Sequence, residues 1–470
     1  MVNKKVKHFK NFMILMVAVL TSLTYLSNVS AAVIEVDSEV SLENALSNGA
    51  TEISLTNDIT LTEDEMTHAT RTVGLEIKGE DTITINGNGH KISTDLVVAV
   101  EIRANADKTV KVVFNDIIIE GTQRVIDTRS DNITLELNDT TLNITKHGNY
   151  QALTIGGNAE SIIVNINNST INGGDAGYGI ITFNPVNMTI NNSNIKGYAA
   201  LYMKEADSSK GSAGSVVTIK NGSVLEGISR YSGGTDNFGT IVLSDINITI
   251  SVIDSTVKAV NTGTSLQVPF SQSSSLDGIV TDKKSVIVVE GKSELIVDTK
   301  IDDESVVLNY NPDQMNVVIK PGVTANVEIA KEYLEAGTET AVDEETGEVT
   351  VIKRYSIILL TPENGTVKLD KEKALPGEII TINATANEDY SVDKIIVLDA
   401  NGNPIEVKDG KFVMPNGETN VKVTFIAVNT APDNAPGNPN TSDVNYTLLV
   451  SVLALGVVGI AIALKKRKFN

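Results

Sequence analysis

The sequence contains no cysteine and no tryptophan, and aromatic residues make up only 4% of its 470 residues. Without cysteine no disulfide can hold the fold together, and in an exported chain this favours a bacterium with a single membrane. Without tryptophan, the aromatic surface for stacking sugar rings is limited to tyrosine and phenylalanine. The 4 histidines show neither a Ser-His-Asp arrangement nor a His-Glu-x-x-His motif. The sequence therefore lacks the common hydrolase signatures.

Basic residues are also scarce, because 38 Lys and Arg stand against 59 Asp and Glu, which gives a net charge of −21. Both ends of the chain are basic, so the part between them is more acidic than the whole. Such a chain repels nucleic acid and anionic membranes, and we predict no nucleic-acid partner. We also predict no cofactor and no metal site. Calcium binding stays open on charge alone, since no segment has the ligand spacing of an EF-hand.

Residues 1–31 have the layout of a secretory signal peptide. Lysines come first, at Lys4, Lys5, Lys7 and Lys10, and an apolar run over 12–26 follows them. The small residues Ala31 and Ala32 then offer a site for signal peptidase. An uncleaved N-terminal anchor is the alternative, but small residues directly after the apolar run favour cleavage.

One type of segment recurs along residues 32–330: a short alternating strand, a polar corner and a second short strand. The copies are TITINGNGHKI (82–92), VKVVFNDIIIEG (110–121), ITLELNDTTLNI (133–144), IIVNINNSTING (162–173), VNMTINNSNIKG (186–197), VVTIKNGSVLEG (216–227), ITISVIDSTVKAV (248–260) and VIVVEGKSELIV (286–297). Their corners follow one another at steps of roughly 23 to 37 residues, which is typical of a solenoid. We therefore predict a β-helix with one coil per repeat, polar corners stacked in ladders, and a short helix over 41–47 that covers its first coil. A β-sandwich is the alternative, but its strands are not spaced in this way.

Acidic residues at the corners are the first candidates for catalysis, because glycoside hydrolysis needs two carboxylates that face each other across a cleft. Asp116, Asp139 and Asp254 occupy a recurring position where Asn, Gly or Lys stands in other coils. Such exchange is typical of turn residues, and we interpret the three as structural. Further acidic candidates are Asp175, Asp236 and Asp245.

A lyase would need a basic residue close to acidic ones. Arg124 and Arg129 lie near Asp127 in the segment RVIDTRS. An ion-paired face of a coil is the favoured interpretation of this group. His90 follows a Gly-rich turn and is interpreted as a surface residue. We predict no catalytic residue.

The opening TEISLTNDITLT…ITINGNGHKI and the recurring corner resemble the pectate-lyase-like superfamily of right-handed parallel β-helices. The resemblance is strongest to its non-enzymatic members in bacterial surface proteins. It covers roughly residues 33–330 and involves the pattern of the repeat without a catalytic motif. It implies an all-β fold whose main part is a right-handed solenoid.

Two further segments complete the extracellular part. Residues 331–354 contain a Glu-Glu-Thr-Gly turn between two β-like segments, and we predict a hairpin connector there. Residues 355–427 alternate short strands with turns such as PENG, LPGE and KDGK, which predicts a small β domain. Their pattern resembles the divergent internalin B-repeat modules of Gram-positive surface proteins, which implies a stalk or spacer.

The C-terminal segment has three parts: a linker rich in Pro, Asn and Gly over 428–445, an apolar run over 446–464, and a basic tail over 465–470. As a helix, the run would span ~28 Å, enough for a membrane core, and the basic tail would stay inside. A permanent membrane anchor is one interpretation of this layout.

The layout also resembles the LPxTG-type sorting signal of Gram-positive bacteria. The corresponding pentapeptide is Asn438, Pro439, Asn440, Thr441 and Ser442. The resemblance implies that a sortase cuts the Thr441–Ser442 bond and joins the carboxyl group of Thr441 to cell-wall peptidoglycan. The sequence departs from the pattern at Asn438, in place of Leu, and at Ser442, in place of Gly, which leaves the sortase class open.

We expect a non-enzymatic binding or adhesion protein, extracellular and covalently attached to the cell wall, with a glycan or protein as its ligand. The expected ligand surface comprises the loops 147–159, 203–214 and 261–279 and the tyrosines of the middle coils. These are Tyr150, Tyr178, Tyr198, Tyr202 and Tyr231. Packing of these rings within the coils is the alternative. A polysaccharide lyase or glycoside hydrolase and a purely structural wall protein are the competing functions.

Overall fold

The computed structural model describes residues 32–62, 71–105, 108–130, 132–156, 162–174, 176–205, 211–228, 238–261, 267–273, 283–298, 308–309 and 315–428. The predicted signal peptide, the sorting pentapeptide, the apolar run over 446–464 and the basic tail lie outside these residues. In the part that is described, no helix is long and apolar enough to cross a membrane. The chain forms two compact units, Met1–Ile352 and Lys353–Asn470.

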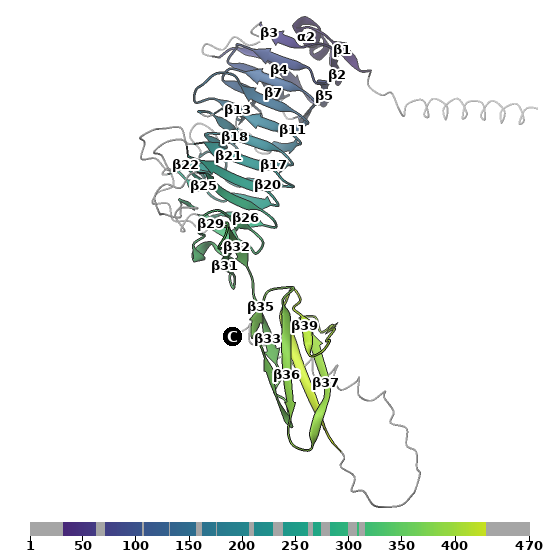
Figure 1. Cartoon of the computed structure of the whole chain (residues 1–470). Coiled ribbons are helices and arrows are strands. Elements are labelled where there is room, and N and C mark those ends of the chain that lie inside the picture. The colour runs from purple at the N-terminus through teal and green to yellow at the C-terminus, as the bar shows by residue number, and fades with distance from the viewer. Residues whose placement is uncertain are drawn as a thin grey trace, which may run out of the picture. The chain divides into compact units, whose positions relative to one another are not determined.

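Three long sheets, parallel except for a terminal hairpin, form the first unit, and each complete turn of the chain contributes one strand to each sheet (Figure 1). The first sheet contains β1 (Ile34–Val36), β2 (Glu52–Leu55), β5 (Thr82–Asn86), β8 (Val110–Asn115), β11 (Ile133–Asn138), β14 (Ile162–Asn167), β17 (Val186–Asn191), β20 (Val216–Lys220), β23 (Thr249–Ile253), β26 (Ser285–Glu290) and β29 (Met315–Ile319). The second contains β3 (Ile59–Leu61), β6 (Lys91–Thr94), β9 (Ile118–Gly121), β12 (Thr141–Ile144), β15 (Thr170–Asn172), β18 (Asn194–Gly197), β21 (Val224–Ile228), β24 (Thr256–Val260), β27 (Glu294–Asp298), β30 (Thr324–Ala325), β32 (Val349–Ile352) and β31 (Glu339–Val342). The third contains β4 (Val73–Gly79), β7 (Val98–Ala104), β10 (Arg124–Thr128), β13 (Gln151–Ile155), β16 (Tyr178–Thr182), β19 (Ala199–Met203), β22 (Phe238–Leu243), β25 (Gln267–Gln272) and β28 (Leu308–Asn309).

This arrangement confirms the predicted right-handed parallel β-helix, but the prediction of two strands per coil was incomplete. Two segments predicted as loops, 147–159 and 261–279, contain β13 and β25 of the third sheet. The alternation that identifies a half-exposed strand is missing there. Five consecutive residues are buried in β7 (98–102), and five in β25 (267–271). A strand buried on both faces lacks the period of two by which the other strands were found.

The chain turns from the first sheet to the second through a residue with left-handed backbone. The angle φ is 46° at Asp116, 50° at Asp139 and 48° at Asp254, and asparagine takes the same place at Asn168 (50°) and Asn192 (47°). Apart from glycine, Asn and Asp tolerate this conformation best. The three aspartates therefore serve the backbone of the corner, in agreement with their structural interpretation.

Two ladders of polar side chains join these corners from coil to coil. In the asparagine ladder, Nδ2 of each residue donates to Oδ1 of the residue one coil earlier: Asn115 to Asn86 at 2.8 Å, Asn138 to Asn115 at 2.9 Å, Asn167 to Asn138 at 2.9 Å, and Asn191 to Asn167 at 3.2 Å. Beside it, the hydroxyl of Ser169 accepts the backbone N–H of Thr140 at 3.0 Å. The hydroxyl of Ser193 accepts that of Ser169 in the same way. Buried polar atoms at the corners are thus paired between coils, as their burial requires.

Aliphatic side chains from all three sheets fill the interior of the β-helix. In one coil, Leu137, Leu142 and Leu153 have no exposed surface. In register, Leu137 lies between Phe114 of the preceding coil and Ile166 of the next. One coil cannot bury these side chains by itself, so the stack of coils is what stabilises each of them.

Short elements cover the two ends of the solenoid. Helix α2 (Glu39–Ser47) starts two residues earlier than predicted, with Ser38 as its N-cap, and buries Leu42 and Ala45 against the first coils. At the other end, β31 and β32 form an antiparallel hairpin, and β32 pairs with β30. Val349 and Val351 of this hairpin join the same hydrophobic core.

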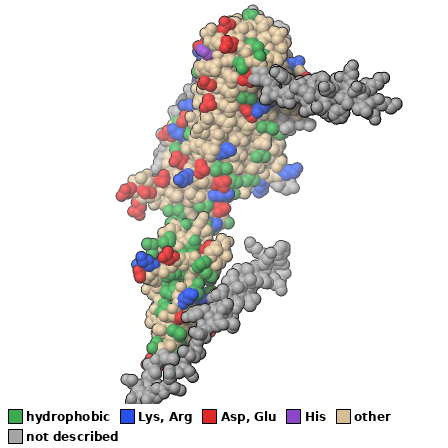
Figure 2. All heavy atoms as spheres, turned by 90° about the vertical axis from the view of Figure 1, so that its right-hand side faces the viewer, with side chains coloured by type: hydrophobic (Ala, Val, Ile, Leu, Met, Phe, Trp, Pro, Cys, Tyr) green, Lys and Arg blue, Asp and Glu red, His purple; other side chains and the backbone are tan. Residues whose placement is uncertain are grey.

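The second unit is a small β domain with its own core. Its strands are β33 (Tyr355–Leu359), β34 (Gly365–Leu369), β35 (Lys373–Ala374), β36 (Ile379–Ala386), β37 (Tyr390–Leu398), β38 (Pro404–Ile405), β39 (Lys411–Val413) and β40 (Thr419–Ala427). They form one sheet of five strands and one of three, around buried side chains that include Val397, Phe412 and Val421. Hydrophobic side chains also gather on its surface (Figure 2). Ile379 on β36 and Val413 on β39 are exposed and pair in register.

Candidate ligand-binding site on the third sheet

The outer face of the third sheet carries the same short motif on three successive coils: an acidic residue, an inward residue and a basic residue. It reads Glu76-Ile77-Lys78 on β4, Glu101-Ile102-Arg103 on β7, and Asp127-Thr128-Arg129 at the end of β10. Side chains alternate along a strand, so the acidic and basic members share the outer face. In register, Glu76 pairs with Glu101, and Glu101 with Asp127. Like charges on adjacent strands repel each other, so this row requires cations close by.

An arginine cluster, consisting of Arg71, Arg103, Arg124 and Arg129, supplies these cations. Glu101 Oε1 accepts from Arg103 Nη2 at 2.5 Å and from Arg103 Nε at 2.6 Å, and Glu101 Oε2 accepts from Arg71. Asp127 Oδ2 accepts from Arg124 Nη1 at 2.9 Å and from Arg129 Nη2 at 2.7 Å. Arg71 also reaches Asp127 at 3.4 Å, and so it joins both carboxylates.

The carboxylates lie beneath the arginines. The side chains of Glu101 and Asp127 are 0% exposed, whereas those of the arginine cluster are between 14% and 29% exposed. A buried charge is stable only with a partner, so the arginines are required by the two carboxylates. Burial lowers the pKa of the Arg71 guanidinium, and the neighbouring Arg129 lowers it further. The arrangement therefore presents guanidinium groups to the solvent and withholds the carboxylates from it.

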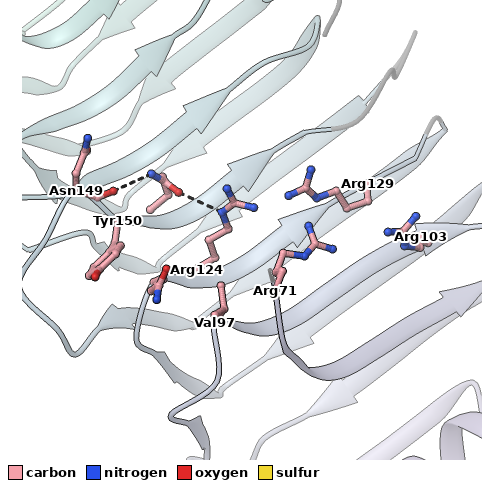
Figure 3. A pocket seen from close by; sticks show the side chains of 9 residues that line it. Arg71, Val97, Arg103, Arg124, Arg129, Asn149 and Tyr150 are labelled. Carbon is pink, nitrogen blue, oxygen red and sulfur yellow. Dashed lines mark hydrogen bonds between the residues drawn. The ribbon is translucent and has the colours of Figure 1, made fainter. Parts of the chain in front are cut away.

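The arginine cluster lines an open pocket of about 660 Å³ (Figure 3). The other residues of its wall are Val97, Gln123, Asn149, Tyr150 and Gln151. Gln151 fixes one part of the wall, because its Oε1 accepts from Arg124 Nε at 3.3 Å and its Nε2 donates to the backbone oxygen of Asn149 at 3.2 Å. Guanidinium and amide donors thus surround a space that one acidic group of a ligand could occupy. By contrast, acidic and basic side chains are dispersed on the face of the β-helix seen in Figure 2.

Tyrosines adjoin this pocket along the third sheet. Arg124, Gln151 and Tyr178 occupy the same register position on consecutive strands. The ring of Tyr178 lies 5.3 Å from that of Tyr202, at an angle of 43°, and 6.2 Å from that of Tyr198. Tyr178 and Tyr202 are partly exposed, and Tyr198 is nearly buried.

Four of the five predicted tyrosines therefore lie on or beside one surface, with Tyr150 in the pocket wall and three packed together. Tyr231, Asp175 and Asp236 lie outside the described residues. Sequence reasoning recognised Arg124, Arg129 and Asp127 as an ion-paired group, and the structure shows these ion pairs.

Sequence reasoning missed Arg71, Arg103, Glu101 and the three wall amides Gln123, Asn149 and Gln151. A signal for part of this set was present, since the acidic-x-basic motif recurs in phase with the coils. Arg71 precedes β4 and carries no such signal, because only the fold brings it to Glu101.

The remaining titratable candidates lie apart from the pocket. His90 Nδ1 lies 3.4 Å from Asp58, on a partly exposed turn. Burial raises the pKa of Asp245, although its carboxylate accepts the backbone N–H groups of Ala213 and Ile246. Across the described ranges, no group of three or more His, Asp and Glu side chains could hold a metal ion.

Two protein families match parts of the chain. A pectate lyase-like adhesive domain family matches residues 33–141, and the divergent InlB B-repeat domain family matches residues 355–429. The first match includes the whole arginine cluster. No curated protein sequence matches the chain.

Two solved structures are similar to this chain at low sequence identity. The L. reuteri 53608 SRRP is 16% identical, with 62% of this chain and 97% of that chain covered and a TM-score of 0.35. The Dettilon tailspike protein is 12% identical, with 82% of this chain and 89% of that chain covered and a TM-score of 0.25.

Proposed function

We propose that the protein is an adhesin-like surface protein that binds a ligand on the outer face of the third sheet and does not transform it. The observation that carries this proposal is that all four arginines of the pocket lie within residues 33–141, which match an adhesive-domain family. A stacked sheet offers the same face on every coil, and such extended surfaces suit the binding of long ligands.

The geometry of the pocket favours binding over catalysis. Glycoside hydrolysis needs carboxyl groups that reach the scissile bond. Glu101 and Asp127 have no exposed surface and are occupied by arginines. The corner aspartates, represented by Asp139, lie at turns between the first and second sheets. The described pocket therefore presents donors for an anion and no accessible pair of carboxylates.

We further propose that the protein is secreted through its signal peptide and joined to cell-wall peptidoglycan by a sortase at Thr441. Its support is the order of pentapeptide, apolar run and basic tail in the sequence. Thr441→Ala should then shift the protein from the cell-wall fraction to the detergent extract, as immunoblots of fractionated cells would show. Ser442→Gly, which restores the common residue of the motif, is the matched control and should leave the protein in the wall fraction. Extraction of the wild type by detergent alone would contradict wall attachment.

Binding can be tested with cells that display the full-length chain. Such cells, and cells without it, are applied to an array of glycans and matrix proteins, and soluble polysaccharides are assayed in parallel for new chain ends. We expect the displayed chain to add binding to at least one array member and to release no chain ends. Equal binding by both kinds of cells would refute the adhesion proposal, and release of chain ends would favour the lyase or hydrolase.

A further inference from the structure

We propose that the arginine-lined pocket is a subsite for one carboxylate or sulfate group of a saccharide, and that Tyr178 and Tyr202 bind the adjacent neutral sugar. This inference rests on the proposed function and specifies the ligand class of the same surface.

The pocket has a local excess of positive charge. The arginine cluster brings four guanidinium groups together, and the acidic row of Glu76, Glu101 and Asp127 contains three carboxylates. These seven groups together carry one net positive charge, in a protein whose net charge is −21. The ion pairs among these residues do not require this excess positive charge, whereas an anionic ligand would neutralise it.

The pocket also supplies hydrogen-bond donors for a ligand. Arg124 donates through Nη1 and Nε, and Arg129 through Nε and Nη2. Within the described ranges, the remaining terminal nitrogens, Nη2 of Arg124 and Nη1 of Arg129, donate to no protein acceptor. Guanidinium groups bind carboxylate and sulfate oxygens through short charge-assisted hydrogen bonds. Gln151 keeps Arg124 in place for such a bond, so the site is ordered before a ligand arrives.

The tyrosine rings lie close enough to the arginines for one saccharide to contact both. Arg124 and Tyr178 are separated by two strand spacings in one register row, a distance of about 10 Å. Tyr202 lies in the neighbouring outward row, and Ser244 Oγ lies 3.1 Å from its hydroxyl. This separation suits a disaccharide with its acidic group at the arginines and the apolar face of the next sugar on the rings.

The acidic net charge of the chain limits the number of acidic groups that a ligand can carry. The positive excess of the pocket is a single charge, whereas the whole chain carries a net charge of −21. A polyanion would gain one favourable contact and meet repulsion along the remaining coils. The favoured ligand is therefore a largely neutral glycan that carries one acidic sugar.

The test uses the full-length chain purified in detergent and titrated by calorimetry with four probes. Lactose is the neutral probe, 3′-sialyllactose carries one carboxylate, 3′-sulfolactose carries one sulfate, and polygalacturonate is a polyanion. We expect one or both of the singly charged probes to bind at least about tenfold more tightly than lactose. The comparison between them distinguishes carboxylate from sulfate as the acidic group.

Variants then locate the site. Arg124→Gln and Tyr178→Ala should each weaken binding of the charged probe about tenfold, and only Arg124→Gln should abolish the preference over lactose. Arg129→Lys keeps the charge beside Asp127 and tests the loss of the guanidinium if Arg124→Gln does not fold. Lys111→Gln removes a cation that pairs with Glu136 on the first sheet and should leave binding unchanged.

Three results would overturn the inference. These are tighter binding of lactose or polygalacturonate than of the singly charged probes, unchanged binding in the folded arginine and tyrosine variants, or no binding of any probe. In each of these cases the adhesion proposal survives if displayed cells still bind other members of the array. If they bind no array member either, both proposals fail.

Discussion

Asp127 is the residue on which the arginine cluster depends most. Its carboxylate has no exposed surface and contacts Arg71, Arg124 and Arg129. Removing one partner of a buried ion pair leaves the others buried without compensation, which typically costs about 3–5 kcal/mol. Asp127→Asn keeps the shape of the side chain but removes the negative charge that balances the three arginines at Oδ2.

We therefore expect Asp127→Asn to destabilise the first unit by about 3–5 kcal/mol, measured from urea denaturation followed by circular dichroism. Glu136→Gln is the matched control, because Glu136 is a partly exposed carboxylate that pairs with Lys111 across coils. Loss of this partly exposed ion pair should lower the free energy of unfolding by less than about 1 kcal/mol. Equal effects of the two substitutions would show that the buried carboxylate does not anchor the arginines.

At the scale of the element, the asparagine ladder joins neighbouring coils. Asn138 lies in its middle, where it donates to Asn115 and accepts from Asn167. Asn138→Ala would leave an acceptor on one coil and a donor on the next without a partner, and each such partly buried group costs about 1–3 kcal/mol. The measurement is the urea midpoint of the first unit. Asn187→Ala, at an exposed position of the same sheet, should leave the midpoint nearly unchanged.

A ladder of charges on the second sheet makes the stability depend on pH. Glu226 lies 2.9 Å from Lys196 and 3.4 Å from Lys258. Burial alone would raise the pKa of Glu226, but the two lysines outweigh it and hold the pKa below its ordinary value of 4.5. A carboxyl group whose pKa falls on folding contributes stability that is present above the unfolded pKa and is lost as pH falls through the folded pKa.

Glu226→Gln should therefore lower the urea midpoint near neutral pH, and the difference from the wild type should shrink as pH falls below about 4.5. Glu294→Gln, at an exposed position on strand β27 of the same sheet, controls for the loss of an acidic residue without an ion pair in the described part of the chain. A difference between wild type and Glu226→Gln that stays constant down to pH 3 would refute this contribution.

Elements also determine how far the sequence could predict the fold. The first and second sheets alternate inward and outward residues around an Asn or Asp corner, and this local pattern repeats visibly in the sequence. The third sheet has inward and outward residues that are both buried, as at Ile102 and Glu101, so its strands have no such period. The arginine cluster is harder still, because Arg71, Arg103 and Arg124 belong to three coils and meet only after the coils stack.

At the scale of the whole molecule, the described part of the chain has two hydrophobic cores that share no residue. One runs through the β-helix from Val36 to Val351, and the other lies in the second unit around Phe412 and Val421. A unit with its own core can fold by itself, and about 75 residues are enough for one β domain. The fragment 353–428 should therefore unfold in one cooperative thermal transition when it is monitored by circular dichroism.

The two cores also predict how a local substitution affects the full-length chain. We expect two transitions on heating, of which one coincides with that of the fragment 353–428. Asp127→Asn should lower the midpoint of the transition of the first unit, because the buried carboxylate belongs to that unit. It should leave the transition of the second unit unchanged. Phe412→Ala, which removes a buried ring from the second core, should do the reverse. If either substitution moves both midpoints by the same amount, the two units unfold as one cooperative body, and the arginine pocket would then draw part of its stability from the second unit.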